Sequence, residues 1–249
     1  MCARLLRVGV GVHGRRKPPF VHERAELPRV VACDGLRRSR HRVKLRGAMP
    51  NPRRQFAGDG QRIALALGSN LGDRQATLRD AWHTILDLIQ PPADTVAVAS
   101  GLYETSPVAT TAPQPDFLNA VMGVATLLEP LELLGRLQSI ERQFGRRRSA
   151  PHQARTLDID ILLIDKQVID VPGLTVPHPR LHERRFVLEP LRDIDPQWLH
   201  PRRQRTVGQM LTDLTSDEPA GGQSIRRLSG PEWLGRSAPD LSPASPHIS

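Results

Sequence analysis

The sequence has little cysteine and no long hydrophobic run. Of its 249 residues only Cys2 and Cys33 are cysteines, so the chain after Cys33 cannot form disulfides or thiolate metal sites. No apolar segment approaches the roughly 20 residues that span a bilayer, and the first residues lack the apolar core of a secretory signal. We therefore expect a cytoplasmic protein that has no membrane partner.

Two common kinds of nucleotide-binding motif are also missing. The sequence contains neither a G-x-x-x-x-G-K-[ST] P-loop nor the H-R-D and D-F-G motifs of protein kinases. The segment 9–14 matches G-x-G-x-x-G by letter, but the Arg-Arg-Lys-Pro-Pro that follows it cannot open the helix that this fingerprint requires. These absences exclude a P-loop kinase and a protein kinase.

Positive charge is concentrated at the N-terminus. Residues 1–62 contain sixteen Lys and Arg against four Asp and Glu, an excess of twelve. Because the whole chain has a net charge of +9, residues 63–249 carry −3. The basic character is therefore a poor argument for nucleic-acid binding by the folded part, and we expect no nucleic-acid partner.

Composition divides the chain into three parts. Residues 1–61 are rich in arginine, interrupted by Gly and Pro, and show no sustained period, so we expect a disordered basic extension. In the alternative interpretation, translation starts at Met49, which would remove most of the excess charge. Residues 62–215 form the expected folded domain, and the Pro, Ser and Gly content of 216–249 predicts a disordered tail.

Hydrophobic periodicity within the domain predicts a ferredoxin-like α+β sandwich with an antiparallel sheet. The order of elements is strand, helix, strand, strand, helix, strand, which is the split β-α-β pattern. Further elements follow, and with them helices would lie on both sides of the sheet. The expected strands are 63–67, 95–104, 117–127 and 157–163, with a short partner around 168–169, and the expected helices are 73–90, 130–144 and 207–214.

A pair of carboxylates is the most informative local feature. Asp158 and Asp160 lie two residues apart in an apolar run, so in a strand they share one face. Adjacent carboxylates repel each other and resist burial, and a hard cation such as Mg²⁺ relieves that cost. With arginines at 146–148 and 155, the pattern suggests phosphoryl transfer. The alternatives are one solvated and one arginine-paired Asp, and arginines that complement a helix dipole.

Two further groups of residues suit ligands. Phe117 and Asn119 share a strand face, and a ring beside an amide suits a flat heterocycle. The alternative is a core phenylalanine and a turn-capping asparagine. Thr175, His178 and Arg184 together suit phosphate, although a lone histidine is more often structural.

Six segments in order resemble the 6-hydroxymethyl-7,8-dihydropterin pyrophosphokinase family of folate biosynthesis. The resemblance extends over roughly residues 62–200 and implies the same ferredoxin-like fold. The segments are Leu-Gly-Ser-Asn-Leu-Gly-Asp at 67–73, Tyr-Glu-Thr-Ser-Pro-Val at 103–108, Gln-Pro-Asp-Phe-Leu-Asn-Ala at 114–120, Gly-Arg-Arg-Arg at 145–148, Arg-Thr-Leu-Asp-Ile-Asp-Ile-Leu-Leu at 155–163, and Val-Pro-His-Pro-Arg-Leu at 176–181 with Arg-Arg-Phe-Val-Leu at 184–188.

The resemblance implies transfer of pyrophosphate from ATP to the hydroxymethyl oxygen of the reduced pterin, with release of AMP. It implies two Mg²⁺ ions on Asp158 and Asp160, charge stabilisation by Arg146 and Arg155, and no partners beyond these small molecules. We expect a monomer. By matching position, the nucleotide would contact Gln138, Glu141, Arg148, His152, Ile161, Thr175, His178 and Arg184, and the pterin would contact Thr105, Ser106, Val108, Phe117, Asn119 and Phe186.

The sequence departs from the family pattern at a few positions. His152-Gln153-Ala154 replaces the Trp-Gly-Pro of many relatives, Gly173 replaces an arginine, and Pro179 replaces a tyrosine. The altered loop at 152–154 motivates one alternative, a catalytically inactive relative, and the other departures predict weaker or differently shared ATP contacts. A second alternative is an RNA-binding ferredoxin-like module, which is disfavoured because the expected sheet lacks closely spaced aromatics.

Overall fold

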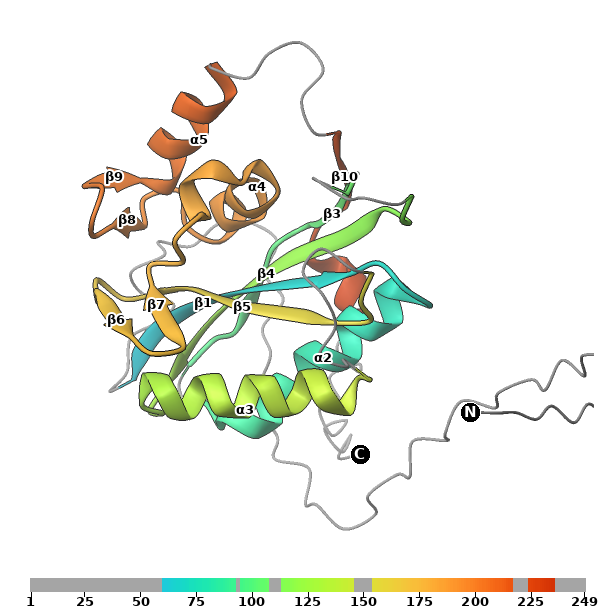
Figure 1. Cartoon of the computed structure of the whole chain (residues 1–249), viewed down its shortest axis with the longest axis horizontal. Helices are drawn as coiled ribbons and strands as arrows, with labels where there is room; N and C mark the ends of the chain where they lie inside the picture. The colour runs from blue at the N-terminus through green and yellow to red at the C-terminus, as the bar shows by residue number, and fades with distance from the viewer. Residues whose placement is uncertain (1–59, 93–94, 108–112, 146–153, 217–223, 236–249) are drawn as a thin grey trace, which may run out of the picture. The chain divides into compact units, whose positions relative to one another are not determined.

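We describe residues 60–92, 95–107, 113–145, 154–216 and 224–235 of a computed structural model. Their main sheet is antiparallel and consists of β1 (Gln61–Ser69), β2 (Val98–Ala99), β3 (Leu102–Thr105), β4 (Phe117–Thr126), β5 (Asp158–Ile164) and β10 (Ile225–Ser229). The strand order is β10-β3-β4-β1-β5, and β2 also pairs with β4 (Figure 1).

Helices cover both faces of this sheet. On one face lie α2 (Arg74–Ile89) and α3 (Pro130–Gln143), and on the other lie α4 (Arg185–Ile194) and α5 (Val207–Ser216) (Figure 1). The predicted α+β sandwich with helices on both sides is therefore confirmed.

Local sequence accounts for the ends of the first two helices. The Asp73 carboxylate accepts a hydrogen bond from the Ala76 N–H (3.0 Å) and caps α2. The helix α2 ends at Ile89, and its C-cap Gln90 directly precedes two prolines that cannot continue the helix. Pro130 stands at the start of α3, and Gly145 follows its end with φ of +82°, a conformation that favours glycine.

Alternation along the strands creates two separate cores. In β1, Ile63, Leu65 and Leu67 face α2 and α3, whereas Ala64 faces α4 and α5. Both sets are almost fully buried. A given strand of this sheet thus contributes alternate residues to two different environments.

Short elements link β5 to α4 and α4 to α5. The hairpin of β6 (Ile169–Val171) and β7 (Leu174–Val176) contains the predicted short partner strand and leads into η1 (Leu181–Glu183). A second pair, β8 (Leu199–His200) and β9 (Arg205–Thr206), precedes α5. Within the described residues, no helix combines the length and the apolar character needed to cross a membrane.

The predicted strand 95–104 is interrupted in the structure. The Ser100 hydroxyl accepts a hydrogen bond from the Val121 N–H (2.8 Å), and the Gly101 N–H donates to the Asp193 carboxylate (3.0 Å). Ser100 keeps a backbone hydrogen bond to β4, from its N–H to the Val121 carbonyl (2.9 Å), whereas the Gly101 N–H bonds to a side chain of α4. This interruption separates β2 from β3. The helix α4 has no counterpart among the predicted elements, although Val187, Leu188, Leu191 and Ile194 recur at helical spacing. Pro190 within it is a residue that ordinarily ends a helix.

The prediction of a disordered tail at 216–249 is wrong for residues 224–235. This stretch forms β10 and the short helix η2 (Pro231–Leu234), in which Trp233 is buried. Trp233 meets Trp82 of α2 edge to face, with ring centroids 6.5 Å apart. The segment has few apolar residues of its own, so its order comes from the sheet and from α2. The predicted extension at 1–61 lies outside the described residues except for its last two, and that prediction stays untested.

Candidate active site

The two carboxylates lie on β5 beside a row of small residues. Asp158 pairs across the sheet with Gly68 of β1, and Gly68 pairs in turn with Asn119 of β4. A Cβ added to Gly68 would lie 3.4 Å from Asn119 Oδ1 and 3.9 Å from Asp158 Cβ. The absence of a side chain at this position therefore leaves space between the carboxylate and the amide.

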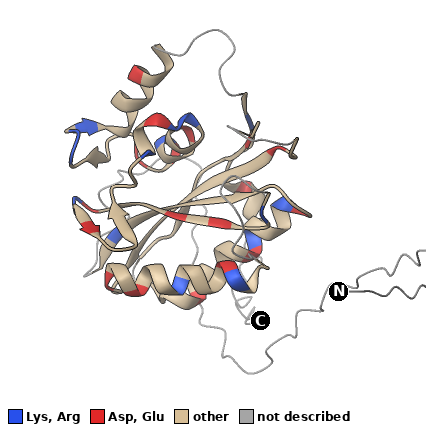
Figure 2. Cartoon of the chain, viewed as in Figure 1, with Lys and Arg blue, Asp and Glu red and all other residues tan. Residues whose placement is uncertain are grey.

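Asp160 occupies the next row on the same face. It pairs with Ala66 of β1, another small residue. The side chains of Asp158 and Asp160 are 26% and 39% exposed, while Ile159 between them is buried against α2 and α3. Red segments of β5, the strand at the edge of the sheet, mark its acidic positions (Figure 2). The structure thus gives both carboxylates a common, partly open face, as the alternation predicts.

Basic side chains from three elements surround the carboxylates. Arg155 Nη1 lies 2.8 Å from Asp158 Oδ2, and Arg184 Nη1 lies 3.6 Å from Asp160 Oδ2. His178 Nε2 lies 3.8 Å from the same Asp160 oxygen. Of the predicted metal, catalytic and phosphate residues, Asp158 and Asp160 therefore converge with Arg155 before β5, His178 after β7 and Arg184 before α4.

Burial determines the protonation of the histidine. Desolvation lowers the pKa of His178 below its usual value, and the charges of Arg184 and Arg180 lower it further, against the opposing effect of Asp160. His178 is therefore neutral near pH 7. Its Nδ1 accepts the Arg180 N–H (3.2 Å), so Nε2 bears the proton and can donate one hydrogen bond without adding charge. Burial also lowers the pKa of Arg184, but a guanidinium remains charged at any physiological pH.

The donor set fits a hard cation only in part. Among the described residues, no cluster of three His, Cys, Asp or Glu side chains could hold a metal ion. Asp158 and Asp160 offer two carboxylates, and Mg²⁺ commonly binds one or two carboxylates together with substrate phosphates and water. This site therefore suits a cation that arrives with a polyphosphate better than it suits a resident metal.

The side chains predicted to contact the nucleotide differ in how far they are exposed to solvent. Gln138 on α3 is exposed, and Thr175 in β7 is partly exposed. Glu141 is buried, and its carboxylate accepts a hydrogen bond from the Ile159 N–H (2.8 Å) at the edge of the sheet. The Ile161 side chain is buried in the core, so only its backbone is suited to meet a ligand.

The predicted pterin contacts gather around β3 and β4. Asn119 Nδ2 donates to Thr105 Oγ1 (2.8 Å), and both side chains are buried. Phe117 is partly buried at the first position of β4. Phe186 packs partly buried against the α4 and α5 core, with the Arg184 guanidinium 5.5 Å from its ring centre. The hydrogen bond to Thr105 thus fixes the orientation of the Asn119 amide.

Asn70 joins the segment before β5 to the segment before β4, a role that the sequence analysis did not assign. Its side-chain oxygen accepts the Arg155 N–H (2.7 Å), and its own N–H donates to the Arg155 carbonyl (3.2 Å). Its amide nitrogen donates to Gln114 Oε1 (3.3 Å) and to the Pro115 carbonyl (3.4 Å). A side-chain amide directly after a buried strand was the available signal.

Four predicted site residues, Val108, Arg146, Arg148 and His152, lie outside the described residues. Arg146 follows Gly145 at the end of α3, and a Cβ added to Gly145 would lie 4.0 Å from Thr156 Oγ1. Thr156 Oγ1 also donates to the Phe144 carbonyl (2.5 Å). The last residues described before this segment, Phe144 and Gly145, therefore lie close to the start of β5.

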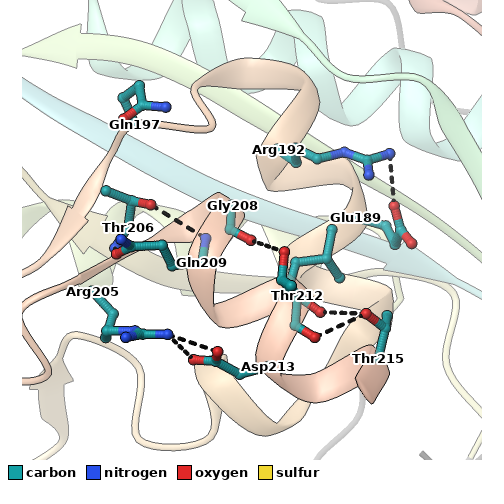
Figure 3. A pocket seen from close by; sticks show the side chains of 11 residues that line it. Glu189, Arg192, Gln197, Arg205, Thr206, Gly208, Gln209, Thr212, Asp213 and Thr215 are labelled. Carbon is teal, nitrogen blue, oxygen red and sulfur yellow. Dashed lines mark hydrogen bonds and ion pairs between the residues drawn. The ribbon is translucent and has the colours of Figure 1, made fainter.

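Two cavities lie beside the described elements. One of about 370 Å³ is lined by Asn70, Arg74, Glu104 and Asp116 and lies beside the residues of β3 and β4 that are predicted to contact the pterin. A larger one of about 570 Å³ lies between α4, α5 and β9 (Figure 3) and includes none of the predicted site residues. Its charged groups pair with one another, Arg205 with Asp213 and Arg192 with Glu189, so the converging carboxylates and arginines of β5 remain the candidate site.

Fold and site together define an α+β protein whose paired carboxylates and basic side chains suit a cation and a polyphosphate. Residues 64–196 match the family model of 7,8-dihydro-6-hydroxymethylpterin-pyrophosphokinase (HPPK). The chain belongs to this family.

The chain is similar to two bacterial proteins named 2-amino-4-hydroxy-6-hydroxymethyldihydropteridine pyrophosphokinase. It is 46% identical to that of Bacillus subtilis over 130 residues, which cover 52% of this chain and 75% of the relative. It is 41% identical to that of Pseudomonas aeruginosa over 171 residues, which cover 68% of this chain and 98% of the relative.

Among solved structures, the chain is similar to wild-type HPPK-DHPS of Plasmodium falciparum with pteroate. The TM-score is 0.49 at 15% identity, and the match covers 64% of this chain and 43% of that one. The chain thus spans less than half of this larger protein.

Proposed function

We propose that this protein transfers the pyrophosphoryl group of ATP to the hydroxymethyl group of 6-hydroxymethyl-7,8-dihydropterin, a step of folate biosynthesis. The observation that carries the proposal is the row Asp158, Gly68 and Asn119, because it sets a carboxylate and a fixed amide on either side of a position without a side chain. Membership of the family supports it. Neither an inactive relative nor an RNA-binding module is favoured by any of these contacts.

In the proposed reaction the pterin alcohol oxygen attacks the β-phosphorus of ATP. A new O–P bond forms, the bond from the β-phosphorus to the α,β-bridging oxygen breaks, AMP leaves, and the hydroxyl proton is released. An alcohol needs no covalent enzyme intermediate, so positioning and charge stabilisation are the protein's main contributions.

The charged residues divide this work. Arg155 and Arg184 bring guanidinium groups to the carboxylates, where they suit phosphate oxygens that gain charge during transfer. Neutral His178 adds a hydrogen-bonding group there. Arg146, by family position, would join them from the segment after α3, and Arg148 and His152 would contact the nucleotide.

Asp158 and Asp160 would hold Mg²⁺, which neutralises polyphosphate charge when it is bound. Two carboxylates on one strand face suit the two ions that the family resemblance implies. Asn119, whose amide is oriented by Thr105, would bind the edge of the pterin, and Phe117 and Phe186 would stack on its faces. A monomeric state and a cytoplasmic location remain expectations.

Product analysis on the full chain tests the proposal. With ATP, Mg²⁺ and the reduced pterin, we expect AMP and the pterin diphosphate in equal amounts. No AMP should form without the pterin or with Mg²⁺ removed by a chelator. Release of ADP would contradict the proposal, and binding of Mg²⁺-ATP without pterin-dependent AMP would favour the inactive relative.

A further inference from the structure

The strand β10 lies outside the part of the chain that matches the family model, which ends at residue 196. It pairs antiparallel with β3, with Ile225 opposite Thr105 and Arg226 opposite Glu104 (Figure 1). The Ser106 N–H donates to the Ser224 carbonyl (3.2 Å). A C-terminal segment therefore holds the strand that carries two predicted pterin contacts, Thr105 and Ser106.

A chain of charged contacts leads from β10 to the other acceptor residues. Arg226 pairs with the Glu104 carboxylate, and Arg74 of α2 pairs with the same carboxylate at 3.1 Å. Both hydrogen bonds lower the pKa of Glu104, so it stays ionised at neutral pH. Glu104 thus links the strand β10 to the helix α2.

The series of charged contacts from Arg226 through Glu104 to Arg74 ends directly beside Phe117. Arg74 Nη1 donates to the Asp116 carbonyl (2.7 Å), and the next residue, Phe117, begins β4. One guanidinium therefore joins Glu104 of β3 to the entry of β4. The cavity of about 370 Å³ is lined by Arg74, Glu104 and Asp116, so this chain also borders open space at the acceptor side.

The C-terminal segment is anchored independently of these charges. Trp233 Nε1 donates to the Ser100 carbonyl (3.0 Å) in a buried contact, and the Trp233 ring packs on Trp82. A Cβ added to Gly101 would lie 2.6 Å from the Ser229 carbonyl oxygen and 2.7 Å from Arg227 Nε. Only glycine at position 101 lets β10 approach so closely, and loss of one ion pair should leave the segment in place.

We propose that β10 and the chain Arg226–Glu104–Arg74 position the acceptor half of the site, so that these residues set the affinity for the pterin and leave the nucleotide half unchanged. The inference rests on the proposed function. Arg74, Glu104 and Arg226 are positioning residues, since each acts through Thr105, Ser106 or Phe117.

Exposure ranks the three contributions. The side chain of Arg226 is 70% exposed, whereas those of Arg74 and Glu104 are 29% and 18% exposed. Exposed pairs contribute little, while partly buried charge-assisted hydrogen bonds contribute more. Arg74→Met should therefore raise the KM for the pterin about tenfold, and Arg226→Met should raise it about twofold.

The experiment compares the KM values for both substrates, with kcat, in full-length Arg74→Met, Arg74→Lys, Glu104→Gln and Arg226→Met. We expect the KM for the pterin to rise while the KM for ATP stays unchanged. Arg74→Lys should fall between Arg74→Met and the unaltered chain, because an ammonium cannot reach both partners in the fork geometry of arginine. Arg205→Met, which breaks a short exposed ion pair between β9 and Asp213 of α5, is the matched control and should change neither KM.

An unchanged KM for the pterin in Arg74→Met would overturn the inference, as would an equal rise in both KM values, which indicates a general loss of structure. If the unaltered chain forms no AMP, the proposed function fails. The inference is then decided by direct binding of the reduced pterin, followed by its fluorescence. Weaker binding by Arg74→Met than by the unaltered chain would support it, and equal binding or none by both would overturn it.

Discussion

The two faces of the central sheet use the same strands for different purposes. On the α2 and α3 face, Ile159 and Ile161 of β5 are buried in a continuous apolar core. On the other face, their neighbours Asp158 and Asp160 are partly exposed among basic side chains. Alternation along one strand thus separates residues that stabilise the fold from residues that hold the proposed reactants.

The second face is itself divided. Ala64 and Val121 continue a core under α4 and α5, whereas Gly68 lies beside Asp158 and Asn119. The difference is side-chain volume: the core positions fill the space beneath a helix, and Gly68 places no side chain between the carboxylate and the amide. Substitutions on the two faces should therefore have separable effects on activity and on stability.

The largest expected effect is on activity and follows from the open face. Asp160→Asn should lower kcat/KM by about 10³-fold or more, since it removes a carboxylate placed to bring metal to the polyphosphate. The free energy of unfolding should change by less than about 1 kcal/mol, because relief of the repulsion from Asp158 offsets the loss of the ion pair with Arg184. Steady-state AMP formation and urea unfolding measure the two quantities. Near-normal turnover by this variant would remove Asp160 from the metal site.

Substitutions on the face that packs against α2 and α3 should have the opposite effect: they should lower stability and leave activity nearly unchanged. Leu65→Ala in β1 removes a fully buried side chain from the α2 and α3 core, and it should lower the free energy of unfolding by about 3–4 kcal/mol. The activity per folded molecule should change little, because Leu65 points away from the carboxylates. Urea unfolding and kinetics at low temperature test this. A loss of turnover without a loss of stability would contradict the division of the faces.

A third prediction concerns acid stability on the α4 and α5 side. Burial, with the charges of Arg203 and His182, lowers the pKa of His200 in β8 to about 4. The unfolded chain takes up this proton below pH ~6.5, while the folded chain does not until about pH 4. The stability contributed by neutral His200 is therefore complete above pH 6.5 and declines as the pH falls from 6.5 to 4, by about 3 kcal/mol in total.

Comparison of the unaltered chain with His200→Asn isolates this effect. Asparagine retains an acceptor in place of Nδ1, which accepts the Arg203 N–H (3.3 Å), but it does not titrate. Unfolding free energies at pH 7 and pH 4.5 should differ less in the variant than in the unaltered chain. Equal pH dependence in the two proteins would show that His200 is not a source of acid sensitivity.

The smallest effect is expected at the surface of α5. Arg205 pairs with Asp213, and their side chains are 47% and 53% exposed. Arg205→Met should change the free energy of unfolding by less than about 1 kcal/mol, because solvent and salt screen such pairs. Thermal unfolding at two salt concentrations measures it. A larger loss of unfolding free energy would contradict this prediction. It would mean that the Arg205–Asp213 pair, which lines the cavity beside α4 and α5, stabilises the fold despite its exposure.

Sequence patterns predicted the elements that have strong local periodicity. The helices α2 and α3 follow from their apolar stripes and end signals, and the common face of Asp158 and Asp160 follows from strand alternation. The break between β2 and β3 was not predictable, because it depends on contacts of Ser100 with β4 and of Gly101 with α4. Likewise, the sequence of Ile225–Ser229 does not indicate that this segment pairs with β3.

By itself, then, the amino-acid sequence determined the sandwich, the carboxylate pair, the arginines near it and the family to which the chain belongs. Only the tertiary structure decided which groups face one another: Gly68 between Asp158 and Asn119, Asn70 between Arg155 and Pro115, and Glu104 between Arg74 and Arg226. The physical reason is that alternation and helical periodicity act over a few residues, whereas these contacts join residues from about 30 to more than 120 positions apart.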